Sequence, residues 1–299
     1  MNKIIKMVGM LVVFFLISYF LSGIIEGESV LEDKIVFIPV KGVISTSADL
    51  FNQDIADPET IAGYLDQADN DDSIKAIILE IDSPGGTVVA SEEIARAVKQ
   101  TKKPVVAWIR ETGASGAYWV ASSADKIVAD PLSMTGSIGV YSGYLEFSGL
   151  FEKYGIDYVD LKSGEYKDTG SPFKELSSDE RLILENKLKI VHSIFIDEVA
   201  KNRNMTIDEV KKLSSGIYYL GLEAYKFGLV DYLGDKNKAI EVAKELSNTK
   251  EVRLVRFERK TGLLGIFNQL STGAFFNIGR GIAYELDFNV KENYLDFRV

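Results

Sequence analysis

Two short segments rich in small residues could supply the reactive groups of a hydrolase. The first, residues 83–86, reads Ser-Pro-Gly-Gly and directly follows a run of apolar residues. Adjacent glycines allow a backbone to expose its N–H groups, so the amide of Gly86 could bind the negative charge that develops on a carbonyl oxygen during acyl transfer. Taken alone, the segment is more typical of a tight turn between a strand and a helix.

The second segment, residues 113–117, reads Gly-Ala-Ser-Gly-Ala and precedes two aromatic residues, Tyr118 and Trp119. A serine in the first turn of a helix lies near unpaired N–H groups and the positive end of the helix dipole, which favours an alkoxide-like transition state at Ser115. Its small neighbours would let a substrate backbone approach. The alternative is a close helix–sheet contact that merely tolerates serine, and the segment alone favours that alternative.

A serine nucleophile needs a base, and the composition restricts the choice. His192 is the single histidine of the chain, and it borders an apolar helical stripe, which predicts a place at the edge of the core. Where histidine is missing, a lysine can act instead, because removal from water favours its neutral form. Lys167 lies in the turn-rich segment 164–172, but its spacing alone does not distinguish it from a solvated surface lysine.

These segments lie in an alternation of strand-like and helix-like stretches that is typical of an α/β domain. Strands are expected at residues 34–40, 74–81, 104–109, 126–129 and 158–161. Helices are expected at residues 57–68, 88–99 and 236–246, and after the caps Ser177 and Thr206. Loops that follow buried strands are where an α/β protein places its chemistry, and both glycine segments lie in such loops.

The helix after Ser177 is expected to be long. Ser177 and Glu180 have the spacing of a capping box. An apolar stripe follows at helical spacing, formed by Leu184, Leu188, Val191, Phe195 and Val199. We therefore predict a long amphipathic helix that packs on the core of one soluble domain.

Composition excludes several classes of function. The chain has 44 acidic against 34 basic residues and a net charge of −10, which repels phosphate backbones, so we expect no nucleic-acid partner. It has no cysteine, which rules out disulfides, thiolate nucleophiles and cysteine-based metal sites. The single histidine rules out metal sites that need two imidazoles from one chain. We predict neither a metal nor a cofactor.

The N-terminus has the composition of a membrane anchor. Residues 7–25 carry no charge and, as a helix, would nearly cover a hydrocarbon core of roughly 30 Å. Lys3 and Lys6 precede this run and acidic residues follow it, so the positive-inside rule places residues 1–6 in the cytoplasm and residues 34–299 on the other side of the cell membrane. A cleaved signal peptide is the competing interpretation, but no small-residue cleavage site ends the run.

Four motifs occur together and in order within residues 34–247. They are Ser-Pro-Gly-Gly at 83–86, Ala-Ser-Gly-Ala-Tyr-Trp at 114–119, Thr-Gly-Ser-Ile-Gly-Val at 135–140 and Tyr-Lys-Asp at 166–168. In this combination the chain resembles the signal peptide peptidase A family, whose members also carry an anchor in front. Asp82 stands where the family often has asparagine, and Ala117 where it often has glycine. Both changes keep the glycine next to Ser115.

The resemblance implies a role for each motif. Ser115 would be the nucleophile and Lys167 the general base, with Ser137 orienting the lysine through a hydrogen bond. The amides of Gly86 and Gly116 would form the oxyanion hole. The implied fold is α/β of the Clp/crotonase-like type, with stacked turns of β-strands and helices outside. The implied reaction is peptide-bond hydrolysis through an acyl-enzyme.

Substrates and partners follow from the same resemblance. Remnant signal peptides and other membrane-associated peptides would be the substrates. Long members of the family are doubled and take the serine and the lysine from different halves, so a single copy would require a ring-like homo-oligomer, with eight copies as one candidate size.

Two other functions compete with this interpretation. An acyl-CoA enzyme of the crotonase class would share the two-amide oxyanion hole, but a body outside the cytoplasm would be separated from the CoA pool. An inactive, membrane-tethered scaffold is the second alternative, and the joint presence of Ser115, Ser137 and Lys167 argues against it.

Overall fold

A computed structural model describes residues 10, 13–14, 32–47 and 55–258 of the chain. The chain separates into two compact units, Met1–Phe257 and Glu258–Val299, and the description below concerns the first. Nearly all of the expected membrane span at residues 7–25 lies outside the described residues. Within the described ranges, no helix is both long enough and apolar enough to cross a membrane.

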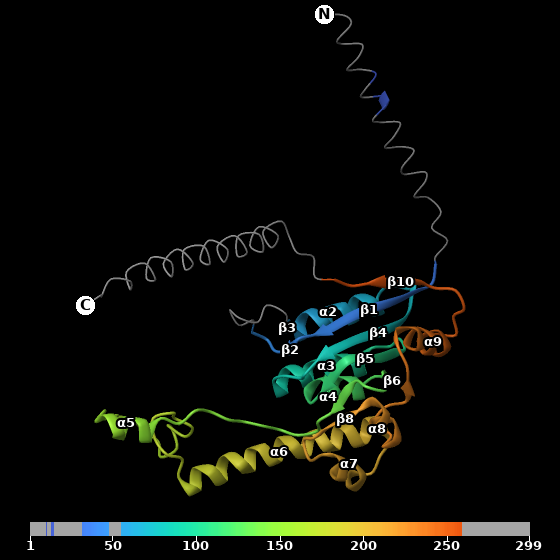
Figure 1. Cartoon of the computed structure of the whole chain (residues 1–299). Helices are drawn as coiled ribbons and strands as arrows, with labels where there is room; N and C mark the ends of the chain where they lie inside the picture. The colour runs from blue at the N-terminus through green and yellow to red at the C-terminus, as the bar shows by residue number, and fades with distance from the viewer. Residues whose placement is uncertain (1–9, 11–12, 15–31, 48–54, 259–299) are drawn as a thin grey trace, which may run out of the picture. The chain divides into compact units, whose positions relative to one another are not determined.

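A mainly parallel sheet forms the centre of the first unit, with the strand order β10-β1-β4-β5-β6-β9 (Figure 1). Its strands are β1 (Lys34–Lys41), β4 (Ile74–Ser83), β5 (Val105–Ala114), β6 (Lys126–Ala129), β9 (Tyr232–Leu233) and β10 (Arg253–Arg256). The end of β5 also pairs with β7 (Met134–Gly136), which pairs antiparallel with β8 (Tyr218–Leu220). A separate small pair joins β2 (Val43–Ile44) to β3 (Ile55–Ala56).

The central strands are buried on both faces, as their apolar runs predict. Alternate side chains point to opposite sides of the sheet. Phe37, Ile78 and Val106 belong to a cluster with Val242 of α9 (Lys236–Ser247), while the intervening residues of the same strands belong to a larger cluster on the other side. That larger cluster includes residues of α2 (Pro58–Asp69), α3 (Val88–Gln100) and α4 (Gly116–Ser122). The α/β expectation is therefore confirmed.

Local capping signals fix where several helices begin. Asp57 accepts a hydrogen bond from the amide of Thr60 and starts α2, with Pro58 as its first residue. Both halves of a capping box are formed at the start of α6 (Ser178–Arg203) and of α7 (Ile207–Leu213). Two further helices of the described residues are α5 (Ser148–Tyr154) and α8 (Gly221–Lys226).

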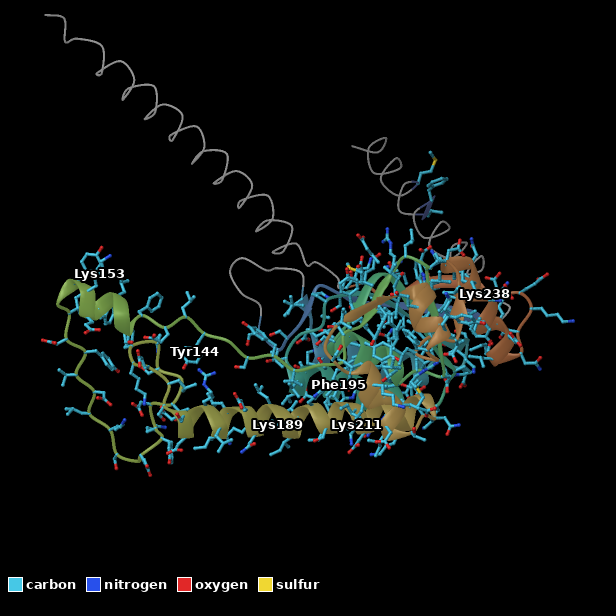
Figure 2. The ribbon with its side chains drawn as sticks, turned by 60° about the horizontal axis from the view of Figure 1, so that its bottom comes forward. Tyr144, Lys153, Lys189, Phe195, Lys211 and Lys238 are labelled. Carbon is cyan, nitrogen blue, oxygen red and sulfur yellow. The ribbon has the colours of Figure 1, made fainter. Side chains whose placement is uncertain are left out.

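Residues 141–177, which we call the arm, differ from the rest of this unit because none of them is buried. The strand expected at residues 158–161 is wrong, since these residues have no regular secondary structure. The arm contains α5, which lies apart from the sheet in both views (Figures 1 and 2). Large apolar side chains on the arm are exposed, with Leu161 at 96% and Tyr141 at 91%.

The long helix α6 packs on the core only over its C-terminal half. Its buried apolar residues begin at Phe195, which lies where the helix meets the body in Figure 2. Leu184 and Leu188, in the first half of the expected stripe, are only half-buried. The prediction of a helix packed on the core is therefore correct for its second half and wrong for its first. The N-terminal end of α6 adjoins the arm, in which none of residues 141–177 is buried.

Candidate active site

Ser115 lies at the sharp junction between β5 and α4. Strand β5 runs on to Ala114, further than its apolar run predicts, because its end pairs with β7. The amide of Ser115 donates to the carbonyl oxygen of Gly136 at 2.8 Å, and α4 begins at the next residue. At this junction Ser115 has a φ of 55° and a ψ of −124°. A serine in such a conformation stores strain of roughly 1–3 kcal/mol, which only a well-packed surrounding can maintain.

Positive φ angles outside glycine single out two serines of the predicted site. Among the described residues, only Ser115, Ser137, Asn204 and Asn248 combine a side chain with a positive φ. The two asparagines are C-caps of α6 and α9, where a left-handed residue is usual. Ser115 and Ser137 have no such ordinary explanation. Strained residues of this kind cluster at active sites, so both predicted positions are marked independently by their backbone.

Gly85 and Gly86 bring their loop into direct contact with the Ser115 junction. Gly85 has a φ of 96°, and a Cβ there would lie 2.7 Å from the amide nitrogen of Gly116. A Cβ on Gly86 would lie 1.9 Å from the carbonyl oxygen of Ile44. A side chain at either glycine would therefore push this loop away from Ile44 or Gly116. The segment is a tight turn, and the same turn packs against the Ser115 junction.

The hydrogen bonds around Gly86 turn its amide away from β2. In the parallel bridge between Ile44 and Gly86, the amide of Ile44 donates to Gly85 and the amide of Thr87 donates to Ile44, both at 2.9 Å. The N–H of Gly86 therefore points to the opposite side, and its nitrogen would lie 3.3 Å from a Cβ on Gly116. No hydrogen bond joins the amide of Gly86 or Gly116 to another group among the described residues.

Ser115 and the two candidate oxyanion amides line one cavity of about 250 Å³. Trp119 and Phe195 form part of its apolar wall, and their rings are stacked with centroids 4.8 Å apart. The helix that carries Trp119 is anchored by Tyr118, whose hydroxyl donates to the carbonyl oxygen of Leu229 at 2.9 Å. Burial raises the pKa of Tyr118, so this hydroxyl stays protonated and keeps its bond at any working pH.

A second cavity, of about 490 Å³, joins Ser115 to Ser137 and His192. The Ser137 hydroxyl donates to the carbonyl oxygen of Gly216 at 2.9 Å. The Nε2 atom of His192 is buried and has no hydrogen-bond partner within the described part of the chain. His192 is half-buried, as expected of a residue at the edge of the core, but the sequence did not predict that it lines a cavity together with Ser115. No spacing signal could have found it, because the two residues come from different elements.

Lys167 lies in neither of these two cavities. It is exposed in the arm, in a turn where its amide donates to the carbonyl oxygen of Gly164 at 3.2 Å. The chain thus brings together Ser115, Gly86, Gly116 and Ser137 but leaves the predicted base on a separate, exposed segment.

No metal-binding group is formed by the described residues, since no three of their histidine, aspartate and glutamate side chains could hold an ion together. The cavity around Ser115 is lined by a hydroxyl on a strained backbone and by the residues of two backbone amides without a hydrogen-bond partner among the described residues. Such an arrangement suits nucleophilic attack on a carbonyl group, with the amides facing the oxygen that becomes negative.

Comparison with known proteins decides between the classes of enzyme that use such an oxyanion site. The model of peptidase family S49 matches residues 97–250, more than half of the chain, and the Clp protease model matches residues 44–133. The chain belongs to peptidase family S49. It is therefore a serine peptidase, and the resemblance to signal peptide peptidase A is confirmed.

Relatives of this S49 peptidase occur in distant organisms. A protein of Methanocaldococcus jannaschii described as a protease is 38% identical over 78% of this chain and 75% of its own length. A protein of Enterococcus faecium described as the signal peptide peptidase SppA is 34% identical over 79% of this chain and 70% of its own. Protease 4 of Haemophilus influenzae is 33% identical over 73% of this chain, which corresponds to only 36% of that relative.

Solved structures support the fold of this S49 peptidase. A lysine-to-alanine variant of the 1510-N membrane-bound stomatin-specific protease, in complex with a substrate peptide, aligns with a TM-score of 0.53 and 16% identity over 80% of this chain and 99% of that one. A serine-to-alanine variant of the same protease aligns with a TM-score of 0.50 and 15% identity, over 77% and 99%. These likenesses confirm an α/β fold with Clp-protease-like neighbours.

Proposed function

We propose that the protein is a membrane-anchored serine endopeptidase that uses Ser115 and Lys167 as a catalytic dyad. The observation that supports the proposal is the strained Ser115 junction, because Ser115 lines a single cavity together with Gly86 and Gly116. These are the parts that acyl transfer needs, apart from a base.

The proposed reaction proceeds in two halves. The Ser115 Oγ attacks the scissile carbonyl carbon while its proton moves to the neutral Nζ of Lys167. The amides of Gly86 and Gly116 bind the resulting oxyanion. When the tetrahedral intermediate collapses, the peptide C–N bond breaks and the lysine gives its proton to the leaving amine. Water then attacks the acyl-enzyme with the lysine again as base, which releases the acid and restores the serine.

The lysine in this proposal comes from a second copy of the chain. Lys167 lies outside both cavities that Ser115 lines, on an arm without a buried residue. The arm also exposes large apolar side chains, including Leu161, Tyr141 and Val159, which a soluble surface rarely leaves uncovered. A head-to-tail ring would cover these side chains and bring each lysine to the serine of the next copy.

Substrates and location are proposed from chemistry and from relatives. The apolar wall formed by Trp119 and Phe195 suits the apolar stretch of a remnant signal peptide. The names of the relatives include signal peptide peptidase, and the stomatin-specific protease is described as membrane-bound and in complex with a peptide. The uncharged run at 7–25 would anchor the enzyme, with residues 1–6 in the cytoplasm and the catalytic domain outside.

His192 is the competing base, because it lines the same cavity as Ser115 and its Nε2 has no partner among the described residues. A serine–histidine pair within one chain would need no second copy. Replacement of the two candidate bases separates these mechanisms, as described in the Discussion.

A serine-reactive acylating probe tests the proposed nucleophile. In detergent-solubilised full-length protein, peptide mapping should find the label on Ser115, and the Ser115→Ala variant should neither react nor cleave peptides. That variant should keep the wild-type Tm, because it retains the Cβ and loses only a half-buried hydroxyl. Label on another serine, or turnover by purified Ser115→Ala protein, would refute the proposed nucleophile.

A further inference from the structure

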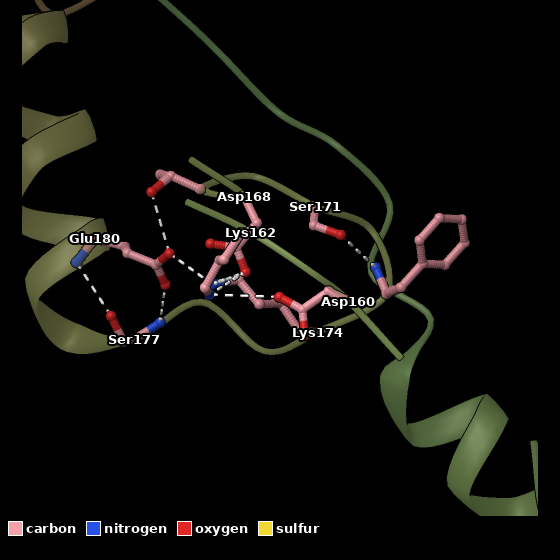
Figure 3. Close-up of polar contacts among 9 residues, drawn as sticks. Asp160, Lys162, Asp168, Ser171, Lys174, Ser177 and Glu180 are labelled. Atoms are coloured by element: carbon pink, nitrogen blue, oxygen red, sulfur yellow. Dashed lines mark hydrogen bonds and ion pairs between the residues drawn. The ribbon is translucent and has the colours of Figure 1, made fainter. Parts of the chain in front are cut away.

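The residue next to the proposed base is the centre of an ion-pair network. The Asp168 carboxylate contacts the ammonium of Lys162 at 2.7 Å and that of Lys174 at 2.8 Å (Figure 3). Its side chain is only 12% exposed, although it lies in an arm with no buried residue. Hydrogen bonds from Lys162 and then from Lys174 hold the pKa of Asp168 far below its usual range. The carboxylate is therefore charged throughout the working pH range.

The network continues from Lys174 to the start of α6. Lys174 lies 2.7 Å from the Glu180 carboxylate, which also accepts from the Thr169 hydroxyl at 3.1 Å and from the Ser177 amide at 3.0 Å (Figure 3). The Lys174 hydrogen bond, followed by that of the Ser177 backbone, lowers the pKa of Glu180 to about 2. Glu180 is itself buried, so the network joins the Lys167 turn to a fixed helix end.

We infer that Lys162, Asp168, Lys174 and Glu180, which we call the charge chain, position Lys167 for catalysis. This inference rests on the proposed function. Without a buried residue, the arm cannot fix the turn by core packing. Its side chains make ring contacts between Phe173 and the rings of Phe151 and Tyr158, and its backbone makes hydrogen bonds over short stretches, such as that from Lys167 to Gly164. The charge chain instead fixes the backbone on the C-terminal side of Lys167 through its nearest neighbour.

The charge chain also balances the charge beside the base. A lone carboxylate at Asp168 would leave an unbalanced negative charge next to the proposed base, which must be neutral to accept a proton. Lys162 and Lys174 offset that negative charge, and Glu180 in turn offsets Lys174.

Other charged groups lie close to the same turn. Asp160 is 3.5 Å from Lys162, Glu165 precedes Tyr166, and Asp179 lies at the start of α6. The charge of Glu165 raises the pKa of Tyr166, so that hydroxyl stays neutral at working pH. These groups are unchanged in variants of Asp168 and Lys174. A difference in kcat or pH profile between such variants therefore arises from the charge chain.

The test compares Lys174→Met and Asp168→Asn with the charge-conserving Lys174→Arg. Both neutral variants should lower kcat by about a hundredfold, the effect of misplacing a catalytic group by about 1 Å, with KM within about twofold of wild type. Lys174→Arg should recover most of the loss. The pH at half-maximal activity should rise in Lys174→Met and fall in Asp168→Asn, because the two changes alter the charge beside Lys167 in opposite directions.

The control variant is Lys238→Met. It removes the ion pair between Lys238 and Glu241 on α9, which at 2.7 Å has the same length as the pair between Lys174 and Glu180. It should leave kcat and the pH profile unchanged. If Lys174→Met lowers Tm, its loss of activity could reflect unfolding, and the kcat and pH profile of the isosteric Asp168→Asn variant then test the inference. The inference fails if both neutral variants match wild type while Lys167→Ala is inactive. If Lys167→Ala itself stays active, the proposed function fails instead.

Discussion

The Ser115 junction and the arm are built on opposite physical principles. All seven residues of α4, which follows Ser115, are buried, and the amide of Ser115 donates to the carbonyl oxygen of Gly136 in β7. In the arm no residue from 141 to 177 is buried, and ion pairs hold the turn around Lys167. Packing can maintain a strained backbone, whereas exposed ion pairs contribute little stability each. The proposed nucleophile is thus held in place by the packing of the fold, whereas the position of the proposed base depends on ion pairs and on the partner that covers the arm.

The largest expected effect is the loss of activity on removal of the general base, which distinguishes Lys167 in the arm from His192 in α6. Lys167→Ala should lower kcat/KM by about 10²- to 10⁴-fold, the usual contribution of a general base, and His192→Ala should change it only a few-fold. Wild-type activity should rise with pH, because only the neutral lysine accepts the serine proton. Steady-state kinetics on a fluorogenic peptide from pH 6 to pH 10 checks both statements.

The opposite outcome would move the whole site into one cavity. If His192→Ala is inactive and Lys167→Ala is not, the base belongs to the Ser115 region, and the arm has no part in proton transfer.

A smaller effect is expected at the glycine loop, where function and packing are both involved. Gly86→Ala should lower kcat by roughly 10²- to 10³-fold through displacement of an oxyanion amide, and should lower the free energy of unfolding by about 1–3 kcal/mol through overpacking against Ile44. The matched control is Gly63→Ala in α2, where a Cβ meets nothing within 4 Å. It should raise the free energy of unfolding by about 0.5–1 kcal/mol and leave kcat unchanged.

Urea unfolding and peptide kinetics on both glycine variants provide the measurement. Full activity in Gly86→Ala would show that this amide does not bind the oxyanion, even if stability falls as expected.

The expected helices and strands were mostly correct where a local signal or an apolar run defines them. The capping box at Ser177 and Glu180 forms as its spacing predicts, because it depends on residues within one turn. The end of β5 was missed because small residues form strand only through pairing with β7. The strand expected at residues 158–161 does not form, and no strand among the described residues pairs with this part of the arm.

Within the candidate site, composition and motifs predicted Ser115, Ser137, Gly86 and Gly116 as site residues, but they could not show the positive φ angles of the two serines. The place of His192 depends on how α6 crosses the cavity, which no local pattern contains. The distance of Lys167 from both cavities is likewise a property of tertiary structure.

The smallest expected effect is the response of the charge chain to acid, through Glu180 at the start of α6. Glu180 has a pKa of about 2 in the folded protein against about 4.3 in the unfolded chain. A depressed folded pKa means that its contribution to stability is complete above about pH 4.3 and is lost as the pH falls through about 2. Glu180→Gln keeps a capping-box residue but loses this charge.

The Tm difference between wild type and Glu180→Gln should therefore be constant from pH 7 to about pH 5 and should shrink below about pH 4. A difference that stays constant down to pH 2 would mean that the Lys174–Glu180 pair does not contribute to the stability of the folded protein.

Mixing two inactive variants tests most directly whether the Ser115 of one copy works with the Lys167 of another copy. Ser115→Ala and Lys167→Ala chains are co-assembled in equal amounts, with hetero-oligomer formation verified by two affinity tags. In a head-to-tail ring about a quarter of the interfaces would pair an intact serine with an intact lysine, so about a quarter of wild-type peptidase activity should return. Mixed oligomers that form but remain inactive would contradict the account, because each site would then lie within one chain.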